Sequence, residues 1–222
     1  NIMRLETSIS REEINLYLTK QINCFFPDNQ EIKSNDLFPF VQSALDKVEY
    51  CFIHVNLPYY KKNNLPYFNH LNSDHFCIFL CFLARVIFVK SNNSHTASKV
   101  FLLNKQLFGI DAFYEIELPD IFIVVHPIGT ILGRADYKNG LVIYQGVTVG
   151  ATTEGIYPVF SENTILYSNS SLIGKCKLGK NFTLGANSSL FNTIIEDNTT
   201  VVGTYPRHRL LKNKNIIKHY FI

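Results

Sequence analysis

The first 108 residues of the chain contain no glycine, since Gly109 is the first of the 11 glycines in the sequence. Apolar residues recur at helical intervals in this stretch, whereas the remainder combines glycine with Leu, Val and Ile. The first pattern predicts helices, and the second predicts short strands joined by turns. We therefore predict two domains, a helical domain over residues 1–107 and a strand-rich domain over residues 108–222.

The sequence also lacks a long apolar run and a strong net charge. Its most apolar stretch, residues 76–88, contains Arg85. It falls short of the roughly 20 residues of a membrane-spanning helix and predicts a buried helix instead. With 21 Lys and Arg against 18 Asp and Glu, the charge of +3 does not indicate a nucleic-acid or anionic membrane partner. The first residues lack the apolar stretch of a signal peptide, so we expect a cytoplasmic protein.

The five cysteines form no CxxC pair, and their number is odd. This usage indicates neither a zinc ribbon nor a disulfide framework. We expect free thiols in a reducing compartment and no bound metal.

Four helices are predicted before residue 108. The first begins at Ser10, with Glu13 as the partner of a capping box. The others are expected over residues 35–50, 73–88 and 97–107, and Ser73 or Asp74 is the expected cap of the third. Residues 56–72 contain Pro58, Pro66 and several Asn, so we expect an irregular connection there.

The second domain carries a repeat of six residues. The repeat places leucines at Leu166, Leu172, Leu178, Leu184 and Leu190. A period of six is not a helix face but is a multiple of the strand period, so it predicts a parallel β-helix built from hexapeptides. The leucines should point inward and stack on their counterparts one coil away, with glycines at corners that need a positive φ or a close backbone approach. A β-sandwich is the competing fold, but the chain lacks its hairpin pattern.

The region around His126 resembles the serine acetyltransferase family of left-handed β-helix acyltransferases. In that family a histidine is followed by glycine at the third position and by an aliphatic-glycine pair, and a Gln-x-Val-Thr-aliphatic-Gly strand comes later. The chain has these elements at His126, Gly129, residues 132–133 and residues 145–150. The resemblance covers roughly residues 108–206, and it implies an α+β protein with a helical N-terminal domain and a left-handed parallel β-helix.

The resemblance implies an acetyl-CoA-dependent O-acetyltransferase with His126 as general base. Acetyl-CoA carries an activated acyl group, so the reaction needs a base for the acceptor hydroxyl and no protein nucleophile. A carboxylate on the far ring nitrogen would fix the tautomer. By resemblance that carboxylate is Asp111, which lies 15 residues before His126. Glu117 and Asp120 lie close in sequence and stay open as alternatives.

The resemblance also suggests where the two substrates bind. Acetyl-CoA would lie along the corners at Gly150, Ala151, Thr152, Gly185 and Ala186, and the basic residues Arg207, Arg209 and Lys212 could meet its phosphates. The acceptor pocket would include Tyr157, with His70 and Asp74 contributed by the helical domain. Each of these residues has a plain structural explanation as a solenoid corner, a helix cap or a solvated tail.

Two departures from the family pattern bear on the acceptor. The family has Asp before the catalytic His, where this chain has Val125, and it has a His-Pro pair where this chain has Tyr157-Pro158. The loss of a carboxylate that meets the acceptor's ammonium weakens the serine interpretation. We therefore expect a sugar or bacterial surface polysaccharide as acceptor, as in the related polysaccharide O-acetyltransferases, with serine as the alternative.

The sequence disfavours two further classes of function. A γ-class carbonic anhydrase needs three zinc-binding histidines, and between Asp111 and Pro206 the chain has His126 alone. A non-catalytic β-helix scaffold is disfavoured by His126 and its family-like context. The family assembles as trimers, so the resemblance implies a homotrimer or a dimer of trimers.

Overall fold

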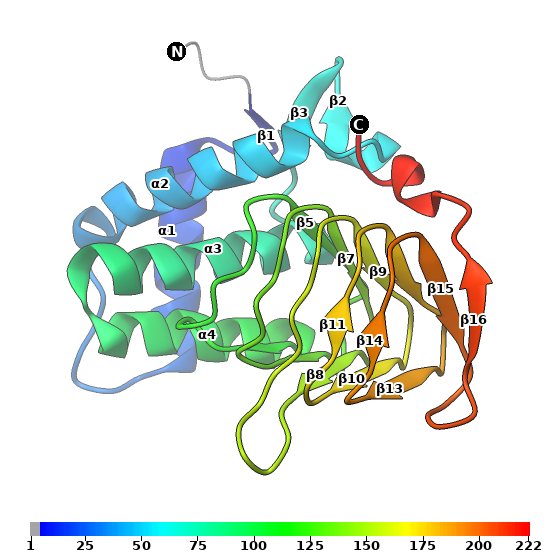
Figure 1. Ribbon diagram of the computed structural model, residues 1–222. Helices are drawn as coiled ribbons and strands as arrows, with labels where there is room; N and C mark the ends of the chain where they lie inside the picture. Colours follow the sequence, from blue (N-terminus) through cyan, green and yellow to red (C-terminus); the bar gives the residue numbers. More distant parts are fainter. Residues whose placement is uncertain (1–4) are drawn as a thin grey trace.

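The computed structural model describes residues 5–222, which form four helices followed by a three-sided parallel β-helix (Figure 1). The helices are α1 (Arg11–Phe25), α2 (Ser34–Ile53), α3 (Ser73–Ser91) and α4 (Ser94–Phe108). They cover the end of the β-helix at which its first coil begins (Figure 1).

Helix starts follow local capping chemistry. The capping box of Ser10 and Glu13 is confirmed at the start of α1. The predicted cap of α3 was wrong, because the residue before the helix is Asn72, whose side chain accepts from the backbone N–H groups of Asp74 and His75. An asparagine one residue earlier thus satisfies the free amides of the first turn and leaves the Asp74 side chain available for other contacts.

Helix α3 lies at the centre of the helical domain. It contains the most apolar run of the sequence and packs against α2, α4 and strand β5 (Phe122–Val125), with the rings of Phe82 and Phe122 5.3 Å apart. The predicted buried helix is therefore confirmed. None of the described helices is long and apolar enough to cross a membrane.

The segment predicted as an irregular connection contains regular structure. It forms η1 (Pro58–Tyr60), β2 (Lys61–Lys62) and β3 (Leu65–Phe68), and β3 also pairs with β1 (Glu6–Thr7). Asn63 and Asn64 both have a positive φ, which suits the tight turn between β2 and β3. The prediction failed because it took the asparagines and prolines as loop signals and missed the hairpin turn.

The β-helix has three faces of parallel strands. The first face is a six-stranded sheet of β5, β7 (Leu141–Tyr144), β9 (Thr164–Leu166), β12 (Phe182–Leu184), β15 (Thr199–Val202) and the antiparallel β16 (Arg209–Lys212). The second face is a five-stranded sheet of β4 (Asp111–Ala112), β6 (Ile131–Leu132), β8 (Thr148–Gly150), β10 (Ser171–Ile173) and β13 (Ser189–Phe191). The third face contains β11 (Lys177–Leu178) and β14 (Ile194–Ile195), extended by bridges at Asp136 and Val159.

The period-six leucines fill the prism as predicted. All five are at most 1% exposed. Leu172 lies beside Leu190 and Leu166 beside Leu184 in neighbouring strands, so these four stack in pairs one coil apart, whereas Leu178 lies beside Ile195.

The corners of the coils use asparagine as well as glycine. Positive φ values occur at the corner glycines Gly129, Gly140, Gly146 and Gly174, and at Asn163, Asn169, Asn181, Asn187, Asn192 and Asn198. Asparagine tolerates this left-handed conformation because its short side chain bonds locally. Along one edge the Nδ2 of Asn163 donates to Asn181 Oδ1, and the Nδ2 of Asn181 donates to Asn198 Oδ1, at 3.1 and 2.9 Å. The sequence analysis missed these asparagine corners.

The basic C-terminal segment covers one end of the prism and then runs back along its outside (Figure 1). After β16 it forms η2 (Ile216–His219), and the hydroxyls of Tyr220 and Tyr144 lie 2.7 Å apart. The N–H of Asn56 donates to the Tyr220 carbonyl at 2.7 Å. The tail therefore connects the β-helix to the loop that follows α2.

Candidate functional site

His126 occupies an unusual backbone position at the end of β5. Eleven non-glycine residues among residues 5–222 have a positive φ, and His126, at 51°, is the one that is not asparagine. A left-handed conformation costs an ordinary L-residue about 1–2 kcal/mol. Such conformations persist at functional sites when the surroundings hold them in place.

The corner that contains His126 is longer than the one stacked on it. Val125 is paired with Tyr144 and Ile131 with Thr148, so residues 126–130 span the same edge as residues 145–147. The longer corner has room for a second left-handed residue, Gly129. His126 is exposed at this corner.

Asp74, in the first turn of α3, lies against His126. The backbone N–H of His126 donates to Asp74 Oδ1 at 3.2 Å, and the Asp74 residue is only 6% exposed. These two residues are 52 positions apart in sequence. The helical domain and the first coil thus build this contact together.

A pocket of about 480 Å³ opens beside the two residues. Its lining includes Tyr59, Ser73, Asp74, Val125 and His126. Asp74 is the one carboxylate among its lining residues, and His126 the one imidazole. The pocket therefore joins a potential base to a buried negative charge.

Burial is the main influence on the ionisable groups of this region. It raises the pKa of Asp74, against the opposing effects of the His126 N–H and the nearby imidazole charge. Burial and the Asp74 charge raise the pKa of Tyr59. Burial lowers the pKa of His75 to about 3, which keeps this neighbouring ring neutral within its aromatic surroundings.

The structure does not join Asp111 to His126. The Asp111 carboxylate forms an ion pair with Lys105 at 2.6 Å, and within residues 5–222 no hydrogen bond connects it to the imidazole. The role of Asp111 as the orienting carboxylate stays a prediction.

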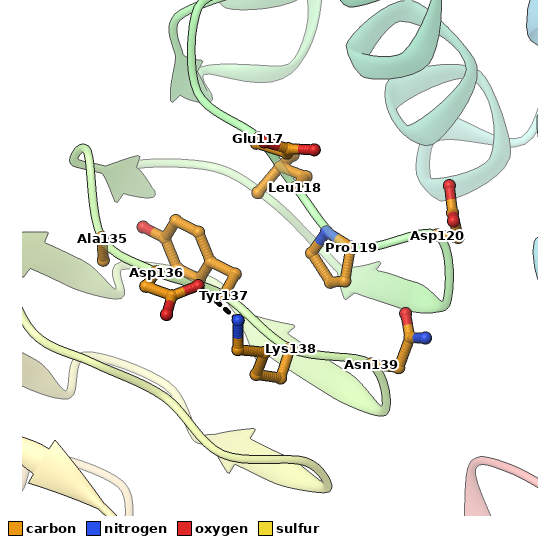
Figure 2. Close-up of a pocket in the computed structure, with 9 residues that line it drawn as sticks. All are labelled: Glu117, Leu118, Pro119, Asp120, Ala135, Asp136, Tyr137, Lys138 and Asn139. Atoms are coloured by element: carbon orange, nitrogen blue, oxygen red, sulfur yellow. Dashed lines mark hydrogen bonds and ion pairs between the residues drawn. The ribbon is translucent and has the colours of Figure 1, made fainter.

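The alternatives Glu117 and Asp120 line a different pocket of about 440 Å³, as Figure 2 shows. Asp120 pairs with Lys47 at 2.8 Å, and Glu117 lies 3.9 Å from Arg85. Neither carboxylate lines the pocket of His126. Asp74, which the sequence analysis placed with the acceptor, is the carboxylate that His126 contacts.

The other two residues predicted to bind the acceptor, His70 and Tyr157, do not line this pocket. His70 Nδ1 is 2.7 Å from Ser8 Oγ, and its ring packs edge-on against Tyr17. The ring of Tyr157 packs against Gly133. Of the three predicted acceptor residues, Asp74 alone lines the pocket of His126.

The residues predicted to bind acetyl-CoA lie on two different edges of the prism. Gly185 and Ala186 follow β12 and share an edge with His126, because β5 and β12 belong to the same sheet. Three strand steps separate them, or about 14 Å at the usual spacing. Gly150 is the last residue of β8, and residues 151–152 begin a loop that projects from the prism (Figure 1). Their binding roles stay predictions.

Within residues 5–222, no group of three or more His, Cys, Asp or Glu side chains is arranged to hold a metal ion. The exposed basic residues Arg207, Arg209 and Lys212 lie in β16 and the turn that leads to it.

Sequence comparison identifies relatives that match about half of the chain. A serine acetyltransferase of Staphylococcus epidermidis is 26% identical over 118 residues, which make up 51% of this chain and 55% of that protein. One from Synechococcus elongatus is 28% identical over 105 residues, or 46% of this chain and 43% of that protein. The chain thus spans about half the length of the curated relatives that it matches. No family model matches it.

Solved structures match over most of the chain. The serine acetyltransferase of Brucella abortus superposes with a TM-score of 0.68 at 15% identity, over 91% of this chain and 84% of that one. That of Vibrio cholerae gives 0.70 at 14% identity, over 90% and 78%. The chain has the serine acetyltransferase fold. The predicted helical domain and left-handed β-helix are therefore confirmed, as is the resemblance to this family.

Ligands are known for several of these serine acetyltransferase structures. A Brucella abortus structure is a complex with coenzyme A, and a Neisseria gonorrhoeae structure is a complex with serine. A closer affinity to the polysaccharide O-acetyltransferases stays a prediction.

Proposed function

We propose that the chain is an acetyl-CoA-dependent O-acetyltransferase in which His126 is the general base. The observation that carries the proposal is the exposed His126, held in a left-handed conformation at a pocket beside a buried carboxylate. Relatedness to serine acetyltransferases supports the reaction class, and the coenzyme A complex of a structural neighbour supports the donor.

The proposed reaction needs few protein groups. The His126 imidazole takes the proton of the acceptor hydroxyl while the hydroxyl oxygen attacks the thioester carbonyl carbon. The C–S bond of the tetrahedral adduct then breaks and releases the coenzyme A thiolate. The imidazolium gives its proton to this thiolate, which restores the neutral imidazole. The products are an acetyl ester and free coenzyme A, so a covalent acyl-enzyme is not required.

Serine is the acceptor that we propose, and it was the alternative in the sequence analysis. The expectation of a sugar rested partly on Val125, which replaces a carboxylate of the family. Asp74 lines the same pocket as Val125, and we propose that its carboxylate meets the acceptor's ammonium group in place of the missing one. A charge-assisted contact of this kind contributes about 1.5–3 kcal/mol. The relatives named serine acetyltransferase also favour serine.

The placement of the predicted acetyl-CoA residues supports an oligomer. Residues 185–186 and 150–152 lie on different edges of one prism, and two copies packed edge to edge would bring both segments to one groove between them. We therefore propose the homotrimer, or dimer of trimers, that the family resemblance implies. Sedimentation analysis that finds a monomer at micromolar concentration would contradict it.

The proposed function is tested by thiol release from acetyl-CoA with serine, nucleotide sugars and bacterial polysaccharides as acceptors. We expect serine to accelerate release and to gain the mass of one acetyl group. His126→Ala should abolish this activity, whereas His219→Ala, at an exposed histidine of the tail, should retain it. Acetylation of a sugar alone would refute the proposed acceptor, and full activity of His126→Ala would refute the proposed base.

A further inference from the structure

Most corners of the β-helix share one hydrogen-bonding rule. The left-handed residue donates its backbone N–H to a carbonyl of the coil before it, and in Gly146, Asn169 and Asn187 that carbonyl is 2.9 Å away. Coil stacking therefore satisfies the amide and helps to hold the left-handed conformation.

In the first corner Gly129 also follows this rule, because its N–H donates to the Gly109 carbonyl at 3.1 Å, but His126 in the same corner does not. His126 follows β5, which is the edge strand of the six-stranded sheet, so no earlier coil of that sheet lies beneath it. Its N–H instead donates to the Asp74 carboxylate of α3. Asp74 thus takes the place of the missing coil.

We propose that Asp74 is a positioning residue that fixes the His126 backbone, and with it the direction of the imidazole at the pocket. This inference rests on the proposed function for its kinetic consequence. The hydrogen bond from the His126 N–H needs an Asp74 oxygen but not a negative charge. Binding of the ammonium group of serine, in contrast, needs the negative charge. The two contributions of Asp74 are therefore separable.

The kinetic test compares Asp74→Asn with Asp74→Ala in the full chain. Asparagine keeps an oxygen for the His126 N–H, so kcat should stay within about threefold of the parent while KM for serine rises about tenfold or more. Alanine removes the oxygen, and a displaced imidazole should lower kcat by about 10- to 100-fold. Equal kcat values for the two variants would overturn the proposal.

A second readout does not depend on activity. Amide hydrogen exchange at residue 126 of the free protein should stay slow in the parent and in Asp74→Asn, and should become fast in Asp74→Ala. Unchanged protection in Asp74→Ala would refute the positioning role even if the protein transfers no acetyl group. Conversely, an inactive parent with this exchange pattern would refute the proposed function and retain the positioning role.

Two further variants guard the interpretation. Asp74→Leu removes the acceptor oxygen while keeping side-chain volume, so it replaces Asp74→Ala if the smaller residue prevents folding, and the same loss of kcat and of protection is expected. Asp36→Ala removes an exposed carboxylate from the first turn of α2. Asp36→Ala should change neither kcat nor amide exchange at residue 126. If it lowers both as Asp74→Ala does, the effect comes from a general loss of helix charge and the inference is overturned.

Discussion

The corner at His126 and the asparagine corners further along the prism all contain left-handed residues, but they differ in what holds those residues in place. At Asn169 and Asn187 a residue suited to the left-handed region bonds to the coil beneath it. At the first corner Gly129 does the same by bonding to the Gly109 carbonyl, and a further left-handed residue, His126, donates its N–H to the buried Asp74 carboxylate instead. We therefore expect the later corners to serve stability, and the first to trade some stability for the position of the proposed base at a pocket.

The largest effect expected from this comparison comes from making the first corner like the others. His126→Asn should lower kcat by at least about 100-fold, because the base is lost. The free energy of unfolding should stay unchanged or rise by up to about 1 kcal/mol, since asparagine suits a positive φ better. Thiol release and urea denaturation measure the two quantities.

The opposite signs of these two effects distinguish a functional corner from a structural one. A variant that loses stability by more than about 1 kcal/mol would show that the imidazole itself supports the fold. A variant with nearly full activity would remove His126 from the mechanism.

The asparagine corners should show the reverse behaviour. Asn181→Ala removes two side-chain hydrogen bonds along its edge and places alanine at a positive φ. We expect unfolding free energy to fall by about 2–3 kcal/mol with little change in kcat. Asn215→Ala is the matched control, because Asn215 also has a positive φ but lies outside the prism corners. An equal loss in both variants would mean that the edge ladder contributes nothing.

Local patterns predicted the parts of the molecule that local chemistry determines. The hexapeptide period placed all five leucines inside the prism, and the Ser10 capping box located the start of α1. Each of these signals lies within a few residues of sequence, and each repeats a known physical requirement.

The contacts that define the pocket could not be found in this way. The bond between Asp74 and His126 depends on how α3 docks against the first coil, and sequence spacing carries no information about that docking. The ion pair of Asp111 with Lys105 likewise depends on where α4 ends. One signal was available and unused: asparagine recurs at the later corners, which makes the histidine at the first corner stand out.

The smallest expected effect concerns the buried charge beneath the first corner. Since burial raises the pKa of Asp74 above its ordinary value, the folded state binds a proton there more readily than the unfolded state. Ionised Asp74 therefore costs stability above the folded pKa, and that cost disappears as the pH falls and the group is protonated. Asp74→Asn should be at least as stable as the parent at pH 7, and urea denaturation at decreasing pH should show the difference shrinking. If the stability advantage of Asp74→Asn over the parent instead grows as the pH falls, the Asp74 charge stabilises this corner. The asparagine corners have no such charge.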